Sequence, residues 1–199
     1  MPVFYWVQDH LIEILGALFG LLYLYLSIRQ NILLWPVGLL TSLMYTLVFF
    51  QSRLYADMSL QVYYIIISIY GWYYWIIHRK KSEKNIVSIK RISRNLFVVL
   101  LLISAILWLI ISFILIKYTD ADLPILDAFT TALSITATWM LAKKYLEHWL
   151  FWVVIDAVST GLYIYKGLYP TVILFIVYTT LAVTGYLEWK KSYTEHDAT

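Results

Sequence analysis

The chain has 199 residues, of which 62% are hydrophobic and only 14% are charged, and its mean hydropathy is +0.74. This is too little polar surface to cover a soluble globule, so the composition predicts a membrane protein. Cysteine is absent, which excludes disulfides, thiolate metal sites and a cysteine nucleophile. The net charge of +3 does not indicate a nucleic-acid partner, because the basic residues lie in short loops between apolar segments.

Seven segments are long enough to cross the hydrocarbon core of a bilayer, which takes about 20 helical residues. In chain order they lie near residues 11–28, 32–50, 57–77, 95–117, 125–142, 148–165 and 169–189. Backbone groups inside lipid must be satisfied within the segment, so we expect seven transmembrane helices and an all-α polytopic membrane protein. The N-terminus lacks a basic region and a cleavage site, and we therefore expect no signal peptide.

The first three and the last three segments match without a gap when the chain is shifted by 114 residues. Most of the matching positions are aromatic residues and glycines, which are poorly replaced in tight packing. The pairs are Trp35 with Trp149, Leu54 with Leu168, Tyr55 with Tyr169, Tyr64 with Tyr178, Gly71 with Gly185, and Trp75 with Trp189. The fourth segment has no counterpart, and a single linking helix makes the two triplets run in the same direction through the membrane.

This pattern predicts a 3+1+3 arrangement of parallel repeats. The expected parts are residues 1–78, the first three-helix repeat; 79–118, a basic inner linker and connector helix; and 119–199, the second repeat with a C-terminal tail. With the N-terminus outside, twelve of the fifteen lysines and arginines fall on the inner side. The positive-inside rule then places the C-terminus inside. The basic linker could also contact anionic membrane lipid, although its charge is explained by topology alone.

Asp156 is the most informative residue, because an aspartate in the middle of a membrane helix costs about 2.5 to 3.5 kcal/mol unless it faces a cavity or a partner. Trp149, Trp152, Thr160 and Tyr163 recur around it at helical spacing and form one stripe. Such a stripe suits a flat, preferably cationic ring, since indoles attract positive charge and a carboxylate supplies the counter-charge. The alternative is that the tryptophans mark the membrane interface and Asp156 bonds a neighbouring hydroxyl.

A second polar stripe lies on the third segment, with Gln61 as the amide expected to face Asp156 or a ligand. An interhelical hydrogen bond that only holds the bundle together is the alternative for Gln61. The other members of this stripe are Tyr64, Ser68 and Trp72. In the second segment Thr41, Ser42 and Tyr45 could line the same cavity. Small hydroxyls in membrane helices often bond their own backbone instead.

The sequence does not predict an enzyme, a metal site or a cofactor. It has no HExxH, GxSxG or glycine-rich phosphate motif, and Asp156 has no reactive partner nearby in the sequence. A carrier for a small molecule fits better. A receptor or assembly protein is the alternative from a different class, but it would not need duplicated halves and a polar stripe at mid-membrane.

The segments WPVGLLTSLMYTLVFFQSRLYADMSLQVYYIIISIYGWYYW and KKYLEHWLFWVVIDAVSTGLYIYKGLY resemble the PnuC family of bacterial vitamin transporters. The resemblance covers nearly the whole chain and implies a SWEET-like fold, a homotrimer, a bacterial inner-membrane location and facilitated diffusion of a vitamin that is trapped inside by phosphorylation. It also implies that Trp152, Asp156 and Gln61 contact the substrate and that Tyr64 and Trp149 close the pocket.

The sequence departs from the pattern expected of nicotinamide riboside carriers. Asparagines are expected at the positions of Asp156, Thr41 and Ser68, and none is present. Losing amides and gaining a carboxylate changes which groups the cavity can hydrogen-bond. We therefore expect thiamine, a fixed cation with an aminopyrimidine, as the first substrate, with nicotinamide riboside as the alternative and riboflavin third.

Overall fold

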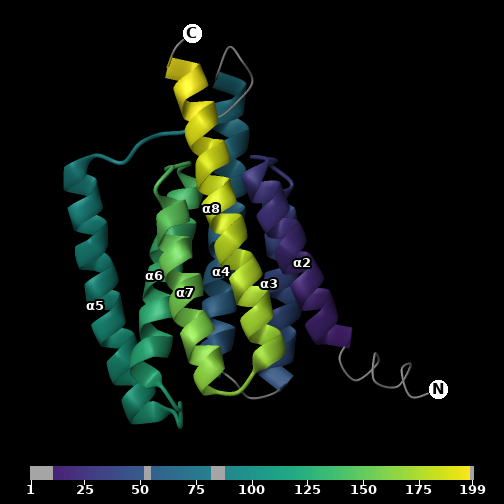
Figure 1. Ribbon diagram of the computed structural model, residues 1–199, viewed down its shortest axis with the longest axis vertical. Coiled ribbons are helices and arrows are strands. Elements are labelled where there is room, and N and C mark those ends of the chain that lie inside the picture. Colours follow the sequence, from purple (N-terminus) through teal and green to yellow (C-terminus); the bar gives the residue numbers. More distant parts are fainter. Residues whose placement is uncertain (1–10, 52–54, 82–87, 198–199) are drawn as a thin grey trace. The chain divides into compact units, whose positions relative to one another are not determined.

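The computed structural model describes residues 11–51, 55–81 and 88–197. These residues form seven helices (Figure 1). They are α2 (Leu11–Ile28), α3 (Leu34–Gln51), α4 (Tyr55–Lys81), α5 (Arg94–Tyr118), α6 (Pro124–Ala142), α7 (His148–Tyr165) and α8 (Tyr169–Asp197). The expectation of an all-helical protein with seven long apolar helices is confirmed. Arg53, Leu54 and Lys84, which entered the prediction of the repeat or of the orientation, lie outside the described residues.

Four helices are long and apolar enough to cross a membrane, counted over the described residues alone. These spans are Met58–Arg79, Arg94–Tyr118, Pro124–Ala142 and Tyr169–Thr194, while shorter apolar helices cover Leu15–Ile28 and Leu34–Leu47. The α7 helix is not among the four, although its 18 residues would reach across the hydrocarbon core. Its polar stripe around Asp156 reduces its hydropathy. The finding agrees with a multi-pass membrane protein.

The chain divides into two compact units, Met1–Trp72 and Tyr73–Thr199, and the boundary lies within α4. In the first unit, α2 packs against α3. The indole of Trp35 is fully buried and lies against Gly71 of α4, where a side chain would collide with it. Close approach of this kind requires glycine.

In the second unit, α5 packs on α6, α6 on α7, and α7 on α8. A buried cluster of Leu100, Ala137, Met140, Phe151 and Ile155 joins α5, α6 and α7. The hydroxyls of Ser104 and Thr136 share a hydrogen bond of 2.7 Å between α5 and α6.

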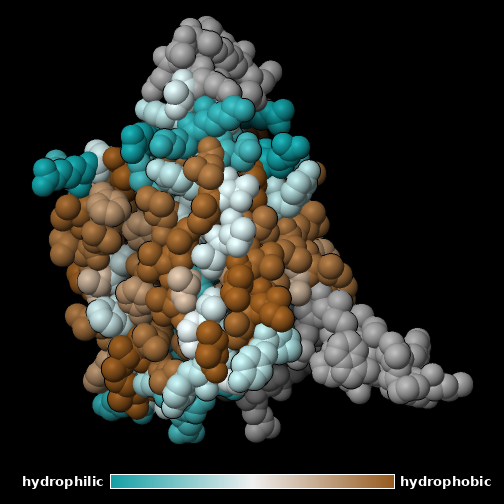
Figure 2. Space-filling model, viewed as in Figure 1, coloured by the Kyte–Doolittle hydropathy of each residue, from teal (hydrophilic) through white to brown (hydrophobic). Residues whose placement is uncertain are grey.

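Much of the remaining α5 surface is apolar and exposed (Figure 2). Leu102, Ile106, Leu109 and Phe113, for example, expose more than half of their side-chain surface. Such a surface suits contact with lipid, as expected of the connector helix.

The same backbone turn follows α2 in the first unit and α6 in the second. Gln30 follows α2 with φ 54°, and Lys144 follows α6 with φ 61°. Around Gln30, Asn31 N–H donates to Leu26 O at 2.8 Å and Gln30 N–H donates to Ser27 O at 3.0 Å. The pattern is a Schellman cap, which is usually completed by glycine.

The turn at Lys144 repeats this hydrogen bonding 114 residues later. Tyr145 N–H donates to Met140 O at 3.0 Å, and Lys144 N–H donates to Leu141 O at 2.9 Å. Both turns therefore have the same backbone path. Each leads into a helix that carries a tryptophan near its start, Trp35 in α3 and Trp149 in α7.

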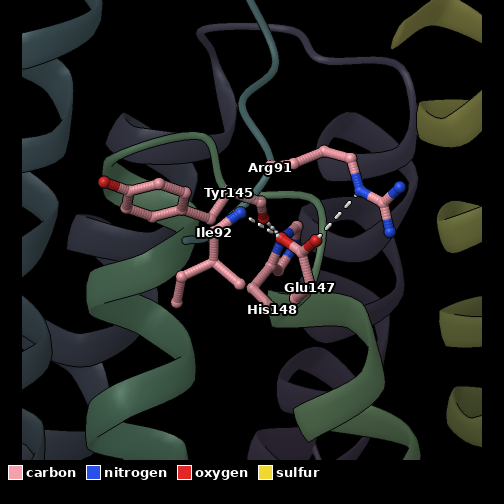
Figure 3. Close-up of polar contacts among 5 residues, drawn as sticks. All are labelled: Arg91, Ile92, Tyr145, Glu147 and His148. Carbon is pink, nitrogen blue, oxygen red and sulfur yellow. Dashed lines mark hydrogen bonds and ion pairs between the residues drawn. The ribbon is translucent and has the colours of Figure 1, made fainter. Parts of the chain in front are cut away.

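The segment before α5 is held against the α6–α7 turn (Figure 3). Lys90 N–H donates to Lys144 O, and Leu146 N–H donates to Lys90 O, each at 2.9 Å. The Glu147 carboxylate accepts a hydrogen bond from Ile92 N–H at 3.0 Å and forms an ion pair with Arg91 at 3.4 Å. We call these contacts of Glu147 the linker clasp. Part of the predicted inner-surface linker is thus fixed by specific contacts.

Candidate functional site

The stripe predicted on the sixth segment lies on α7, in the second unit. Asp156 is only 5% exposed, and among the described residues none forms a hydrogen bond or an ion pair with its carboxylate. Trp152 is half-buried and packs beside the cluster that joins α5, α6 and α7. Because a buried carboxylate is costly without compensation, the Asp156 side chain calls for a partner of complementary charge or a hydrogen-bond donor.

Thr160 and Tyr163, toward the C-terminal end of the stripe, make contacts that are common in membrane helices. The Thr160 hydroxyl donates to the backbone carbonyl of Asp156 at 2.7 Å, which is the backbone bonding common for threonine in membrane helices. Tyr163 lies against Phe175 of α8, with ring centroids 4.9 Å apart, and Phe175 continues to Tyr178 at 5.5 Å. Aromatic contacts therefore connect α7 with α8 near the C-terminal end of α7, about two turns after Asp156.

Trp149 occupies a different environment from Trp152. It is 1% exposed, and its ring lies among His148, Gly185 and Trp189. Its indole N–H is buried and has no acceptor among the residues that the structure describes. This position favours a packing role for Trp149, which differs from both the pocket-closing and the membrane-interface role that the sequence suggests.

The predicted residues of the first unit lie on α3 and α4. The Thr41 hydroxyl donates to Val37 O at 2.8 Å, and the Tyr45 phenol lies against Gly16 of α2. Ser68 is buried on α4, close to Gly38. The remaining three residues are Gln61 and Tyr64, which are half-buried, and Trp72, which is 36% exposed.

The structure thus places the predicted residues in two groups. Asp156, Trp152, Trp149 and Thr160 share one face of α7. Gln61, Tyr64, Ser68, Trp72, Thr41 and Tyr45 belong to the first unit. Whether Gln61 meets Asp156 stays a prediction.

Sequence reasoning did not assign a role to Lys144. Its side chain is 1% exposed, and its ammonium lies 4.8 Å from the ring centre of Trp75 and 5.7 Å from that of Trp189. Trp75 N–H in turn donates to Ala142 O at 3.1 Å. Burial lowers the pKa of Lys144 to about 7. The signal available in the sequence was that Lys144 lies 114 residues after Gln30, at a turn that both halves contain.

No group of three His, Asp or Glu side chains that could hold a metal ion is found within residues 11–51, 55–81 and 88–197. One side of α7 carries an indole, a carboxylate and a phenol. These groups can stack on a flat ring and neutralise a positive charge.

A helical membrane protein with such a stripe is a candidate carrier, and the comparisons with known proteins identify its family. The family model described as nicotinamide mononucleotide transporter matches residues 10–191. The chain belongs to this family, which includes the PnuC proteins, and the expected resemblance is confirmed. It is therefore a member of a transporter family and not of an enzyme family.

Individual relatives cover most of the chain. The nicotinamide riboside transporter PnuC of Escherichia coli (strain K12) is 27% identical over 91% of this chain and 85% of its own length. The riboflavin/roseoflavin transporter RibM of Streptomyces davaonensis is 23% identical over 92% of this chain and 86% of its own length. The crystal structure of the vitamin B3 transporter PnuC matches with a TM-score of 0.76 at 22% identity, over 98% of this chain and 87% of that one. This last match shows that the fold is shared.

Proposed function

We propose that this protein carries a vitamin of the nicotinamide riboside type across the membrane. Family membership and the PnuC relatives support this substrate class. Thiamine, the first choice from sequence, lacks such support, since the relatives are named for nicotinamide riboside and riboflavin. The expected order is corrected accordingly, with nicotinamide riboside first.

The observation that carries the proposal is the Asp156 carboxylate beside Trp152 on α7, buried and with no partner among the described residues. Nicotinamide riboside contains a positively charged pyridinium ring. Such a ring can stack on the indole of Trp152 while its charge offsets that of Asp156. The presence of aspartate instead of an amide is therefore compatible with nicotinamide riboside.

Thiamine is kept as a second candidate because of the same carboxylate. Its thiazolium ring is a fixed cation, and its aminopyrimidine can donate hydrogen bonds to a carboxylate. Charge-assisted contacts are about twice as strong as neutral ones. Asp156 would then select thiamine over a substrate that needs a neutral amide at this position.

Uptake into proteoliposomes tests both candidates. Labelled nicotinamide riboside, thiamine and riboflavin would each be supplied outside vesicles that contain the purified protein, with protein-free vesicles as the control. We expect saturable uptake that unlabelled nicotinamide riboside inhibits most strongly. Stronger inhibition by thiamine would favour the second candidate, and the absence of all uptake would contradict a vitamin transporter.

We also propose that transport is facilitated diffusion, because the family resemblance implies it and the sequence has no nucleotide-binding motif. Trapping inside the cell would require phosphorylation by a separate enzyme. An imposed proton or sodium gradient should leave the final internal concentration equal to the external one. Accumulation above the external concentration would contradict the proposal.

The predicted parallel repeat and N-outside orientation belong to the same proposal. The matching turns at Gln30 and Lys144 and the matching contacts of Trp35 and Trp149 support the repeat. In the second unit, the start of α5, the α6–α7 turn and the end of α8 lie at one end (Figure 1). This end carries most of the basic residues of the unit, among them Arg94, Lys143 and Lys190, whereas Lys117 and Lys166 lie at the other ends of α5 and α7; this excess supports an inner location.

The homotrimer implied by the family resemblance is likewise proposed. Light scattering of the purified protein, with the detergent contribution subtracted, would give the mass of the assembly. A mass of three chains is expected, and a monomer would contradict it.

A further inference from the structure

The indole of Trp149 rests on a glycine of the neighbouring helix. A Cβ atom added to Gly185 of α8 would lie 2.6 Å from the Cη2 and Cζ2 atoms of Trp149 and 2.7 Å from its Cε2 atom. Cβ atoms do not approach other atoms this closely, so any larger residue at position 185 would displace the ring or the helix. The absence of a side chain at Gly185 thus sets how closely α7 and α8 approach at this end.

Neighbouring rings leave the Trp149 indole little room to move away from a side chain added at Gly185. The His148 ring lies 4.6 Å from that of Trp149, and the Trp189 ring lies 5.8 Å away at 84°. His148 and Trp189 are themselves fully buried and contact each other at 4.8 Å. Since well-packed cores absorb extra volume only through strained side chains or backbone shifts, the start of α7 would have to move.

The opposite end of the helix pair is also fixed. A tight turn joins α7 to α8, in which Gly167 has φ 70° and Leu168 N–H donates to Tyr163 O at 3.0 Å. The α7–α8 pair is therefore held at both ends and has the most extensive helix contact of the second unit. Sites carried on such rigid elements are positioned most precisely.

We propose that Gly185 and Trp149 form a seat that positions the substrate-facing stripe of α7, so that both act as positioning residues for the vitamin. Asp156 follows Trp149 by seven residues, about two helical turns, and Trp152 lies between them. A displacement of the ring at the start of α7 is therefore passed directly to both side chains. This inference rests on the proposed function.

The first unit contains the same arrangement 114 residues earlier, where Trp35 lies against Gly71. An identical seat on a helix that lacks the carboxylate shows that the contact is a packing device independent of Asp156. The contact of Trp149 with Gly185 affects binding because α7, unlike the helix that carries Trp35, also carries the Asp156 carboxylate.

The test is a cycle of variants studied by calorimetry with nicotinamide riboside and by thermal unfolding. Gly185→Ala should bind at least tenfold more weakly and melt at a lower temperature. Trp149→Phe lacks the outer atoms of the indole that meet the added methyl group, so the double variant G185A/W149F should recover most of the lost affinity. Gly161→Ala is the matched control, because an added Cβ at this α7 position meets nothing within 4 Å; it should bind as wild type does.

A distance measurement keeps the test independent of the ligand. The chain has no cysteine, so spin labels can be attached to cysteines introduced at two exposed positions, Leu150 on α7 and Ile173 on α8. Gly185→Ala should shift or broaden the distance distribution, and the double variant should restore it. An unchanged distribution with unchanged affinity would overturn the seat. If wild type binds no vitamin but the distances change as expected, the proposed function fails while the packing contact stands.

If Gly185→Ala does not fold, Trp149→Phe alone replaces it. This variant removes the outer ring atoms and leaves the glycine in place, so it loosens the seat without a collision. We expect weaker binding and a broader distance distribution. Wild-type values for both would overturn the proposal.

Discussion

The two halves of this protein share a backbone pattern and differ in their chemistry. Both contain a helix that ends in a left-handed turn, at Gln30 in one half and at Lys144 in the other. In both, a tryptophan then packs against a glycine of the third helix. At the position of Asp156, however, the first half has Ser42, and both residues are buried.

This difference separates packing from function. The turns have the same backbone conformation in both halves, and the tryptophan and glycine of the helix contact are the same, because both halves need the same close packing. The buried charges Lys144 and Asp156 occur in the second half alone, where the first half has Gln30 and Ser42. Burying a charge is costly, so its presence in one half points to a specific role there.

The largest expected effect concerns Trp152, whose counterpart 114 residues earlier is Gly38. If its indole stacks on the vitamin ring, Trp152→Ala should weaken binding by about 1 to 3 kcal/mol, whereas Trp152→Phe should lose less because a π face survives. Calorimetry on the folded variants measures this. Unchanged affinity in Trp152→Ala would assign the residue to packing and remove one functional difference between the halves.

The linker clasp is expected to contribute stability to the second half alone. Glu147→Ala leaves the Ile92 N–H without its acceptor and removes the Arg91 ion pair, which should lower the free energy of unfolding by about 2 kcal/mol. Glu147→Gln should lose less, because an amide oxygen can still accept from Ile92. The counterpart Leu33 is 55% exposed, so Leu33→Ala is a matched control with little expected effect. Equal melting temperatures for Glu147→Ala and wild type would contradict the clasp.

The carboxylate of Asp156 is the sharpest difference between the halves. Asp156→Asn should weaken thiamine binding at least tenfold, about 1.4 kcal/mol, and should shift relative preference toward nicotinamide riboside. Ser42→Ala is the matched change in the first half, and it keeps the Ser42 carbonyl that accepts from Thr46 at 2.7 Å. Because a hydroxyl carries no charge, Ser42→Ala should weaken the binding of either vitamin less than Asp156→Asn weakens the binding of thiamine. If Asp156→Asn binds both vitamins as wild type does, Asp156 is structural.

The smallest effect is expected from pH. Burial lowers the pKa of Lys144 to about 7, below the ordinary lysine value of 10.5 that applies in the unfolded chain. The unfolded state therefore binds more protons between pH 7 and pH 10.5, so the stability contribution of Lys144 increases with rising pH in this window and is lost as pH falls toward 7. The indoles of Trp75 and Trp189 favour the charged amine and oppose the shift, so we expect about 1 kcal/mol between pH 7 and pH 9.

Comparison of wild type with Lys144→Gln isolates this contribution, because the other titrating groups are common to both proteins. The substitution also gives the second half the residue that the first half has at Gln30. The difference in melting temperature between the two proteins should change in favour of wild type as pH rises. A pH-independent difference would show that Lys144 keeps an ordinary pKa.

The sequence by itself determined the membrane class, the seven helices and the family. Long apolar segments must be helical in lipid, so composition and length alone place most helix ends to within about four residues; α8 is the exception, because it continues to Asp197, beyond the predicted end at 189. The WxxW at Trp149 and Trp152 and the glycines at 71 and 185 are recognisable without any structure. Asp156 could be singled out for the same reason, because the cost of a charge in a membrane helix does not depend on knowing its neighbours.

Tertiary structure decided the roles within those motifs. Trp149 and Trp152 are three residues apart on one stripe, yet Trp149 is enclosed by His148, Gly185 and Trp189 while Trp152 is half-buried. Helical spacing cannot distinguish them, since what covers each ring is contributed by other helices. The burial of Lys144 between Trp75 and Trp189 was hidden for the same reason, because the residues around it are separated by more than forty positions in the chain.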